Sequence, residues 1–575
     1  MKPPERLPAI LRRWKLLSLC IGANLLEAVL VLSFAPRSDL ALAPQASAIG
    51  PFGVFHDLRW LSVYSNSWWS PAEIAAILAG RALFIAACVR WAWPDADTGS
   101  KDGLSVPARP SWLRLWGRGA VASVLLAAFL WPSVAVLFAS AVVPVSWLFI
   151  AAVPAAVFVS VVVQPVAIGD GWWRRAIPLR AIGWALFSFV VVTVAGLVAS
   201  AAPSAPEAAI AAAVLTGVFN AWAWNGTVRA VARPARRPER IRPVVPVALA
   251  ALVGGVVAGA LAGFTQARQT AVQSVRAQEA HAAVPQSGPP VLIVDGYGSR
   301  WTGVEDHPIP GAWAETHFSY RGYGPDGSPL SYAGADTVKT LKDLVRLLAS
   351  QVVALSERDR QPVRVVAESE GAIVTEAYLH STPNAPVSTA ILLSPLLTSA
   401  AVSYPAGGSS GWGQAGEWGM SALGGAFQSS APIDLSPQNH FLRSIVADGP
   451  LVRRLDSCPV RGVRQVGLLS LADAVGVPPH LRPAFPTVVL PFFHGGMLQR
   501  RSIERMVGTL LANKKVHNDH MMSALASAVS WAASSWQVPN LPDSYFGHTI
   551  GRSPRGQCDA VDGGLASLIW GAPSR

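Results

Sequence analysis

The sequence predicts an α-helical polytopic membrane domain of about seven spans, followed by an α/β domain with a mostly parallel sheet. First, the 575 residues are 51% hydrophobic and only 14% charged, whereas soluble domains carry about 25% charged residues. Second, the long apolar runs all lie before residue 265. Third, short apolar runs bounded by Gly, Pro and Asp alternate with helical patterns after it, as in sheets with crossover helices. This composition excludes a disordered chain, a disulfide-dense mini-protein and an ordinary all-soluble enzyme.

Seven apolar runs in residues 1–264 have the length that a bilayer core of about 30 Å requires, which is about 20 residues. They lie near residues 16–35, 71–93, 119–140, 144–168, 181–203, 207–226 and 245–264. Pro144 divides the long stretch from Ala120 to Ile168, because proline ends helices. The first run follows a basic segment, as in a signal peptide, but it lacks a clear cleavage site and more spans follow. We therefore interpret it as an uncleaved first helix.

The distribution of charge gives the orientation of the predicted spans. Cytoplasmic loops collect Lys and Arg. The N-terminus and the second, fourth and sixth loops are rich in these residues, whereas the odd loops hold only Arg37 and Arg59. This alternation predicts a multi-pass protein of the cell membrane, with a cytoplasmic N-terminus and an extracytoplasmic C-terminal domain. The net charge of +12 is thus mostly a topology signal, so the expected partner is the lipid bilayer and not a nucleic acid.

Three ionisable residues, Glu27, Glu73 and Arg81, lie within or near the predicted spans. Ionisable residues inside a membrane are candidates for function. The alternative is a polar seam that faces the bundle interior, since Glu73 and Arg81 are eight residues, or about two helical turns, apart.

Residues 265–288 are polar and predict a linker or stalk, and residues 289–575 predict the α/β domain. The expected strands are Val291–Val294, Thr316–Tyr320, Val363–Ala367, Thr389–Leu393, Gln465–Leu469 and Thr487–Leu490. The expected helices are Asp336–Leu355, where apolar residues recur at helical spacing, Ile503–Leu511 and His520–Trp536. Helices of this kind cover the two faces that a parallel sheet must bury.

Ser369 is the candidate nucleophile. A β-branched run leads into Ala367-Glu368-Ser369-Glu370-Gly371, and a helical segment follows. Small residues on either side of a serine permit a sharp strand-to-helix turn that exposes the hydroxyl above the sheet. A simple turn with a capping serine is the alternative interpretation.

The pattern resembles the nucleophile elbow of the α/β-hydrolase family, G-x-S-x-G, with Ala367 in place of the first glycine. The resemblance covers residues 289–540 and does not extend to the membrane half. It implies an oxyanion hole formed by the backbone amides of Tyr297, after Val294-Asp295-Gly296, and of Glu370. Asp295 replaces a histidine that is frequent in the family, but a backbone donor needs no particular side chain.

The family order of nucleophile, acid and histidine implies the remaining site residues. Asp473 follows an apolar strand and would orient the imidazole, and His494 ends the last strand run and would act as the general base. His520 and His517 are rivals for the histidine. The rivals for the acid are Asp434, Asp448 and Asp456.

Residues 398–455 form a long Gly- and Trp-containing insertion, in the place where the family carries a lid. A disordered surface excursion is the alternative.

Four cysteines are too few for a disulfide framework. Cys20 and Cys88 lie in predicted spans, whereas Cys458 and Cys558 lie in the predicted outer domain, where the compartment permits a disulfide between them. No His/Cys cluster has the spacing of a metal site, and neither a metal nor another cofactor is expected.

Together these features predict a membrane-anchored extracytoplasmic serine hydrolase, an esterase, lipase or acyltransferase, that acts through acyl-Ser369 on ester substrates such as lipid or envelope esters. The alternative is a non-catalytic membrane receptor, scaffold or transporter whose outer domain keeps a hydrolase shape. Glu368 and Glu370 favour it slightly, because they place negative charge beside a nucleophile.

Overall fold

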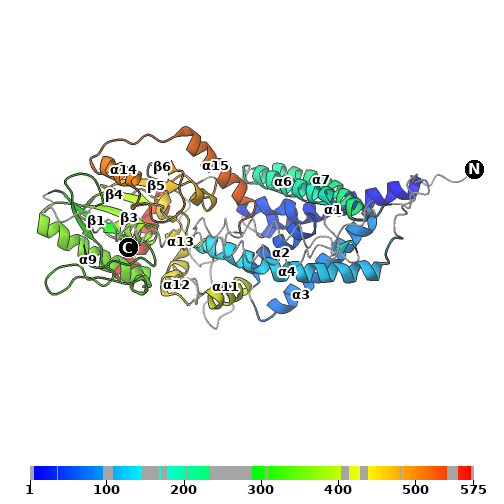
Figure 1. The fold of residues 1–575 in the computed structure, drawn as a ribbon, viewed down its shortest axis with the longest axis horizontal. Helices are drawn as coiled ribbons and strands as arrows, with labels where there is room; N and C mark the ends of the chain where they lie inside the picture. The colour runs from blue at the N-terminus through cyan, green and yellow to red at the C-terminus, as the bar shows by residue number, and fades with distance from the viewer. Residues whose placement is uncertain are drawn as a thin grey trace, which may run out of the picture.

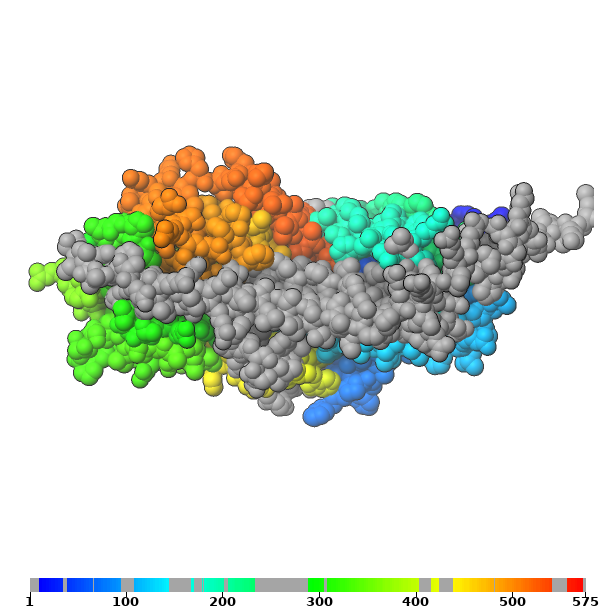
Figure 2. All heavy atoms as spheres, viewed as in Figure 1, coloured from blue at the N-terminus to red at the C-terminus, as the bar shows by residue number. Residues whose placement is uncertain are grey.

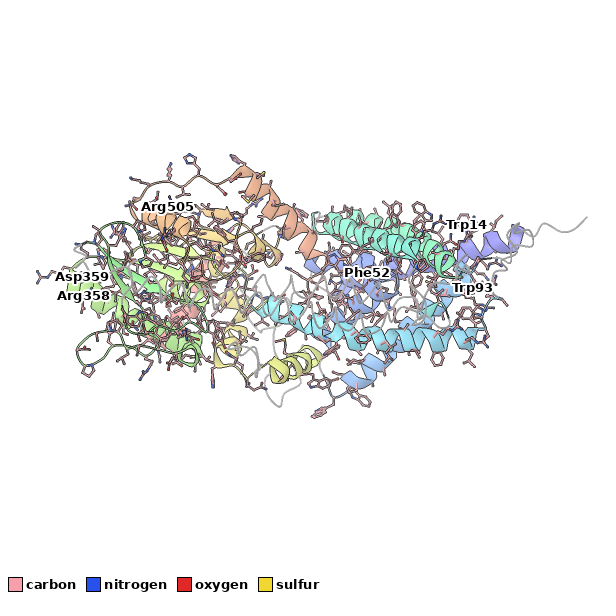
Figure 3. The ribbon with its side chains drawn as sticks, viewed as in Figure 1. Trp14, Phe52, Trp93, Arg358, Asp359 and Arg505 are labelled. Atoms are coloured by element: carbon pink, nitrogen blue, oxygen red, sulfur yellow. A yellow bond between two sulfur atoms is a disulfide. The ribbon has the colours of Figure 1, made fainter. Side chains whose placement is uncertain are left out.

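The structure is a computed structural model of an elongated molecule, with a helical bundle on the N-terminal side and an α/β domain on the C-terminal side (Figures 1 and 2). It describes residues 6–571, apart from 35–36, 66, 95–107, 144–166, 170–177, 202–204, 233–287, 305–307, 403–413, 428–437, 480 and 540–553. Trp14 and Trp93 lie at the end of the bundle that is remote from the α/β domain (Figure 3).

Five helices of the described bundle contain a stretch that is long and apolar enough to cross a membrane. They are α1 (Arg6–Phe34), α3 (Ser70–Ala92), α4 (Trp112–Val142), α6 (Leu179–Ala201) and α7 (Pro206–Ala232). They correspond to the predicted spans at 16–35, 71–93, 119–140, 181–203 and 207–226. The predicted span at 245–264 lies outside the described residues, as do nearly all of the span at 144–168 and of the linker at 265–288.

The segment between α1 and α3 corrects one expectation. The sequence predicts an outer loop there, but the 3₁₀ helix η1 (Arg37–Gln45) and the helix α2 (Gly50–Tyr64) are almost completely buried within the bundle. Pro44 and Pro51 interrupt this apolar stretch, and the 15 residues of α2 extend only about 22 Å, which is too short to cross the bilayer. Broken helices at membrane depth are stable where protein surrounds them. A search for long uninterrupted apolar runs therefore misses this element.

The α/β domain contains a six-stranded sheet in which all neighbouring strands are parallel, in the order β2-β1-β3-β4-β5-β6. The strands are β1 (Pro290–Val294), β2 (Ala314–His317), β3 (Val363–Glu368), β4 (Val387–Leu393), β5 (Arg464–Ser470) and β6 (Thr487–Leu490). β2 ends earlier than the predicted Thr316–Tyr320, because the backbone N–H of Ser319 donates to the side chain of Gln351 instead of a neighbouring strand.

Helices cover both faces of the sheet. On one face lie α9 (Leu341–Asp359), α10 (Glu370–Ser381) and α16 (Pro554–Trp570), and on the other lies α14 (Arg501–Leu511). α15 (His520–Ser534) packs beside β6. α9 begins later than the predicted Asp336, because the side chain of Thr340 caps its first turn by accepting from Asp343. A disulfide joins Cys458 to Cys558 in α16.

The long insertion between β4 and β5 contains α11 (Gln414–Phe427), α12 (His440–Ala447) and α13 (Gly449–Val452). α11 packs closely on the bundle, since a Cβ atom at Gly416 would lie only 2.7 Å from the carbonyl oxygen of Ser62 in α2. The backbone N–H of Ala400 donates to the carbonyl of Val142, at the end of α4, over 2.8 Å. The domain therefore sits on the end of the bundle at which α4 finishes (Figure 1). The interpretation of the insertion as a lid remains a prediction.

Candidate active site

Ser369 lies in a strained turn between β3 and α10. Its φ of 55° and ψ of −112° fall in a region that non-glycine residues rarely adopt, at a cost of about 1–3 kcal/mol. Close backbone packing holds the turn: the N–H of Ser369 donates to the carbonyl of Leu393 over 3.0 Å. A Cβ atom at Gly371 would lie 2.5 Å from the carbonyl oxygen of Val294, so a larger residue there would displace the turn. This geometry presents the hydroxyl at the carboxyl edge of the sheet.

Three residues from three strand ends form a hydrogen-bonded chain at this edge. His494, in the loop after β6, places Nε2 2.8 Å from Ser369 Oγ. Its Nδ1 lies 3.0 Å from Oδ2 of Asp473. The structure thus brings together the serine, the histidine and the acid that the sequence selects. Parallel strands make this possible, because their carboxyl ends share one edge of the sheet.

Asp473 lies on η6 (Ala472–Val475), a 3₁₀ turn directly after β5. Its carboxylate is buried, and its backbone N–H donates to Ser470 Oγ over 3.1 Å. Burial by itself lowers the pKa of His494, but the charge and hydrogen bond of Asp473, with a contribution from Glu368, shift the net pKa above its ordinary value. The imidazolium that forms when a base accepts a proton is therefore stabilised at this position.

Glu368 has a role that the sequence did not reveal. Its carboxylate accepts the backbone N–H of Met497 over 2.9 Å and so ties β3 to the loop that carries His494. Burial raises the pKa of Glu368 to about 7, with the nearby charge of Asp295 adding to the shift. In the sequence, the only indication of a role for Glu368 is its position beside the candidate nucleophile. Nothing in the sequence indicates its contact with Met497.

Glu370 lies on the other side of the serine in the sequence, and its side chain is fully buried. Burial raises the pKa of its carboxyl group well above the ordinary value. The hydroxyl of Tyr320 lies 3.1 Å from Oε2 of Glu370 and 2.6 Å from the carbonyl oxygen of Asp295. The Tyr320 hydroxyl is the donor in both contacts. The raised pKa of Glu370 disfavours negative charge at this position, which weakens the objection that a glutamate beside the serine raises.

The two predicted amide donors of the oxyanion hole lie on either side of the serine. Glu370 is the first residue of α10, and the first N–H groups of a helix have no partner within the helix. Tyr297 follows Gly296, where an added Cβ would lie 3.0 Å from that of Ser369. The Tyr297 hydroxyl accepts from Asn439 Nδ2 over 2.6 Å, which links this loop to the insertion.

The rival residues have other contacts where the structure describes them. His520 begins α15, and Asp519 caps that helix by accepting from the N–H of Met521. Asp456 accepts from the N–H of Thr398 over 3.0 Å, and Asp448 flanks α12 and α13. His517 precedes α15 in an irregular segment, and Asp434 lies outside the described residues.

Within the described part of the chain, no group of three His, Cys, Asp or Glu residues is arranged to hold a metal ion. Comparisons with protein-family models, with curated proteins and with solved structures each gave no match to this chain.

Proposed function

We propose that the protein is a membrane-anchored serine hydrolase that acts on carboxylic esters through an acyl-serine intermediate. The observation that carries the proposal is the chain from Asp473 through His494 to Ser369 Oγ, with distances of 3.0 and 2.8 Å. The backbone strain at Ser369 and the order of the three residues along the chain support membership of the α/β-hydrolase family.

In the proposed mechanism, Ser369 Oγ attacks the ester carbonyl while His494 Nε2 removes its proton. The amides of Tyr297 and Glu370 stabilise the oxyanion, and the positive end of α10 adds to this stabilisation. His494 then returns the proton to the leaving alcohol. Attack on the acyl-serine by water completes hydrolysis, whereas attack by another alcohol completes acyl transfer.

We also propose that the α/β domain is extracytoplasmic and that its substrates are lipid or envelope esters. The basic N-terminal segment and Trp14 lie at the opposite end of the bundle from this domain (Figure 3), which agrees with cytoplasmic retention of basic residues. A periplasm-active reporter fused after Leu393 should be active. An inactive reporter in a stably expressed fusion would reverse the orientation.

Labelling by a fluorophosphonate tests the proposed nucleophile. The full-length protein should be labelled, and Ser369→Ala should abolish the labelling. Ser356→Ala is the matched control, because Ser356 lies near the end of α9 and its hydroxyl donates only to the local carbonyl of Gln361. A folded protein without Ser369-dependent labelling would favour the receptor, scaffold or transporter alternative. The observation that favours this alternative is a set of ionisable side chains in the interior of the bundle, which includes Glu27, His56 and Arg81.

A further inference from the structure

A short segment of the α/β domain, Ser535–Gln537, enters the end of the membrane bundle. Trp536 is only 4% exposed. Its ring stacks on Phe189 of α6 at 4.7 Å between centroids and meets Phe52 of α2 edge-on at 5.8 Å. The indole N–H donates to Thr193 Oγ1 over 2.9 Å. This segment is therefore fixed to the bundle by both apolar and polar contacts.

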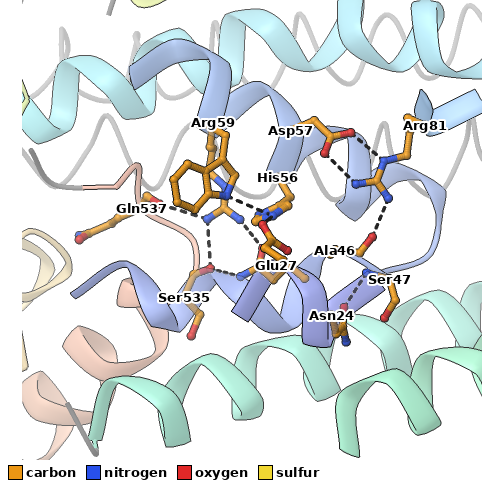
Figure 4. Close-up of polar contacts among 12 residues, drawn as sticks. Asn24, Glu27, Ala46, Ser47, His56, Asp57, Arg59, Arg81, Ser535 and Gln537 are labelled. Carbon is orange, nitrogen blue, oxygen red and sulfur yellow. Dashed lines mark hydrogen bonds and ion pairs between the residues drawn. The ribbon is translucent and has the colours of Figure 1, made fainter. Parts of the chain in front are cut away.

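Arg59 of α2 holds the same segment from inside the bundle (Figure 4). Its side chain is completely buried, and Nη1 donates to the carbonyl oxygens of Ser535 and Gln537, each over 3.1 Å. Nη2 donates to the side chain of Gln45, which in turn donates to the carbonyl of Ser535. Burial of a guanidinium is costly unless it is hydrogen-bonded, and these hydrogen bonds of Nη1 and Nη2 all go to this segment or to Gln45, which is bound to it. The position of Arg59 and that of the segment are therefore linked.

The side chain of Gln537 extends this contact to the candidate active site. Its Nε2 donates to the carbonyl oxygen of Val475, the last residue of the turn η6 that carries Asp473. Ser530 of α15, shortly before the segment, donates to the carbonyl of Val477, two residues after this turn. Three steps thus connect a bundle arginine to the proposed catalytic acid: Arg59 to Gln537, Gln537 to Val475, and Val475 to Asp473 along one turn. A fourth contact continues from Asp473 to His494.

We propose that Arg59 is a positioning residue, through which the membrane bundle aligns Asp473 with His494. The inference rests on the proposed hydrolase function. Its physical basis is that a small displacement of an oriented group, even one caused by a distant change, lowers a reaction rate by up to about 100-fold. The bundle therefore supplies part of the geometry of the active site in addition to an anchor.

The experiment compares Arg59→Met, Arg59→Lys and Gln537→Leu in the full-length protein in lipid nanodiscs. Arg118→Met is the matched control, because Arg118 also donates to a backbone carbonyl in the bundle, that of Ile168, but far from the α/β domain. The readouts are the rate constant of fluorophosphonate labelling, its pH dependence, the fraction labelled at completion and hydrogen exchange of residues 470–477.

Arg59→Met and Gln537→Leu should lower the rate constant by about 10- to 100-fold, while the fraction labelled stays close to that of the parent. The acidic limb of the pH profile should move to lower pH, because a misaligned Asp473 no longer raises the pKa of His494. Hydrogen exchange at residues 470–477 should be faster in both variants, and Arg59→Lys should keep part of the rate that Arg59→Met loses. In a variant that carries both Arg59→Met and Gln537→Leu, the loss of rate should be smaller than the two single losses combined. Arg118→Met should resemble the parent.

A purely structural role predicts a smaller labelled fraction with an unchanged rate constant and pH profile, and that result would overturn the proposal. A lower rate constant in Arg59→Met with an unchanged rate constant in Gln537→Leu would also overturn it, because the proposed connection between Arg59 and Asp473 passes through Gln537. If Arg59→Met does not fold, the other two variants decide by the same criteria. If the parent protein is never labelled, the proposed hydrolase function is overturned instead. In that case, hydrogen exchange at residues 470–477 that is the same in Arg59→Met as in the parent would also overturn the positioning role.

Discussion

Each half of the molecule contains a carboxylate–imidazole pair with a buried imidazole, and the two pairs differ in what the second ring nitrogen contacts. In the α/β domain, His494 contacts Asp473 through Nδ1 and Ser369 Oγ through Nε2. In the bundle, His56 contacts Glu27 through Nε2, and its Nδ1 has no hydrogen-bond partner among the described residues. A carboxylate and an imidazole are therefore not sufficient for nucleophilic catalysis, since the opposite nitrogen must also reach a hydroxyl.

The largest expected effect separates the two histidines. His494→Gln should reduce ester hydrolysis and fluorophosphonate labelling by about 10³- to 10⁴-fold, because it removes the base that we propose for the Ser369 proton. His56→Gln should leave the rate per labelled molecule within about threefold of the parent. The measurement is the labelling rate of both variants in nanodiscs. Equal losses in the two variants would break the distinction between the pairs.

The two carboxylates offer a second comparison. Asp473→Asn should lower the rate by about 10²- to 10⁴-fold, because the amide can no longer stabilise the imidazolium. In the parent, the rate should rise with pH through the pKa of His494, which lies above its ordinary value of 6.5. In Asp473→Asn this limb should move to lower pH. Glu27→Gln should leave the limb in place, and a matching shift there would show that the bundle pair is coupled to the reaction.

The α/β half could be predicted from sequence further than the bundle. Apolar β-branched runs locate all six strands, and small residues on both sides of Ser369 indicate the sharp turn before the structure shows it. Asp473 and His494 follow from strand ends and from order along the chain. The burial of α2 could not be predicted, because proline divides its apolar segment into lengths that are too short to cross a membrane. The contact of Arg59 with Ser535 joins residues 476 positions apart, and no local pattern encodes such a pairing.

The cysteines provide the third comparison. Cys458 and Cys558 are bonded across 100 residues, whereas Cys20 and Cys88 are buried and free. Cys558→Ser should lower the free energy of unfolding of the α/β domain by about 2–5 kcal/mol, because the unfolded chain regains the entropy of an open loop. Cys20→Ser should leave that domain's transition unchanged. The measurement is thermal unfolding followed by near-UV circular dichroism, and equal shifts in the two variants would contradict the assignment of the bond to the α/β domain.

Glu368 gives the smallest expected effect, and it distinguishes a carboxyl group that titrates from one that is permanently charged. Burial raises its pKa from 4.5 to about 7, so the folded state favours the protonated form. The contribution of Glu368 to the free energy of unfolding is complete below about pH 4.5 and is lost as pH rises through about 7. The loss amounts to about 3 kcal/mol.

Glu368→Gln imitates the protonated carboxyl and still accepts the Met497 N–H, so its unfolding free energy should fall by about 3 kcal/mol less than that of the parent as pH rises from about 4.5 through 7. Its labelling rate should stay within about threefold of the parent. The control is Glu357→Gln, at an exposed position of α9, and its unfolding free energy should depend on pH as that of the parent does. A Glu368→Gln variant whose unfolding free energy falls as steeply as that of the parent between pH 5 and 7.5 would mean that Glu368 is ionised throughout. The candidate site would then hold a fixed negative charge beside Ser369. Such a charge would disfavour the oxyanion of the proposed reaction, and this result would therefore favour a non-catalytic domain.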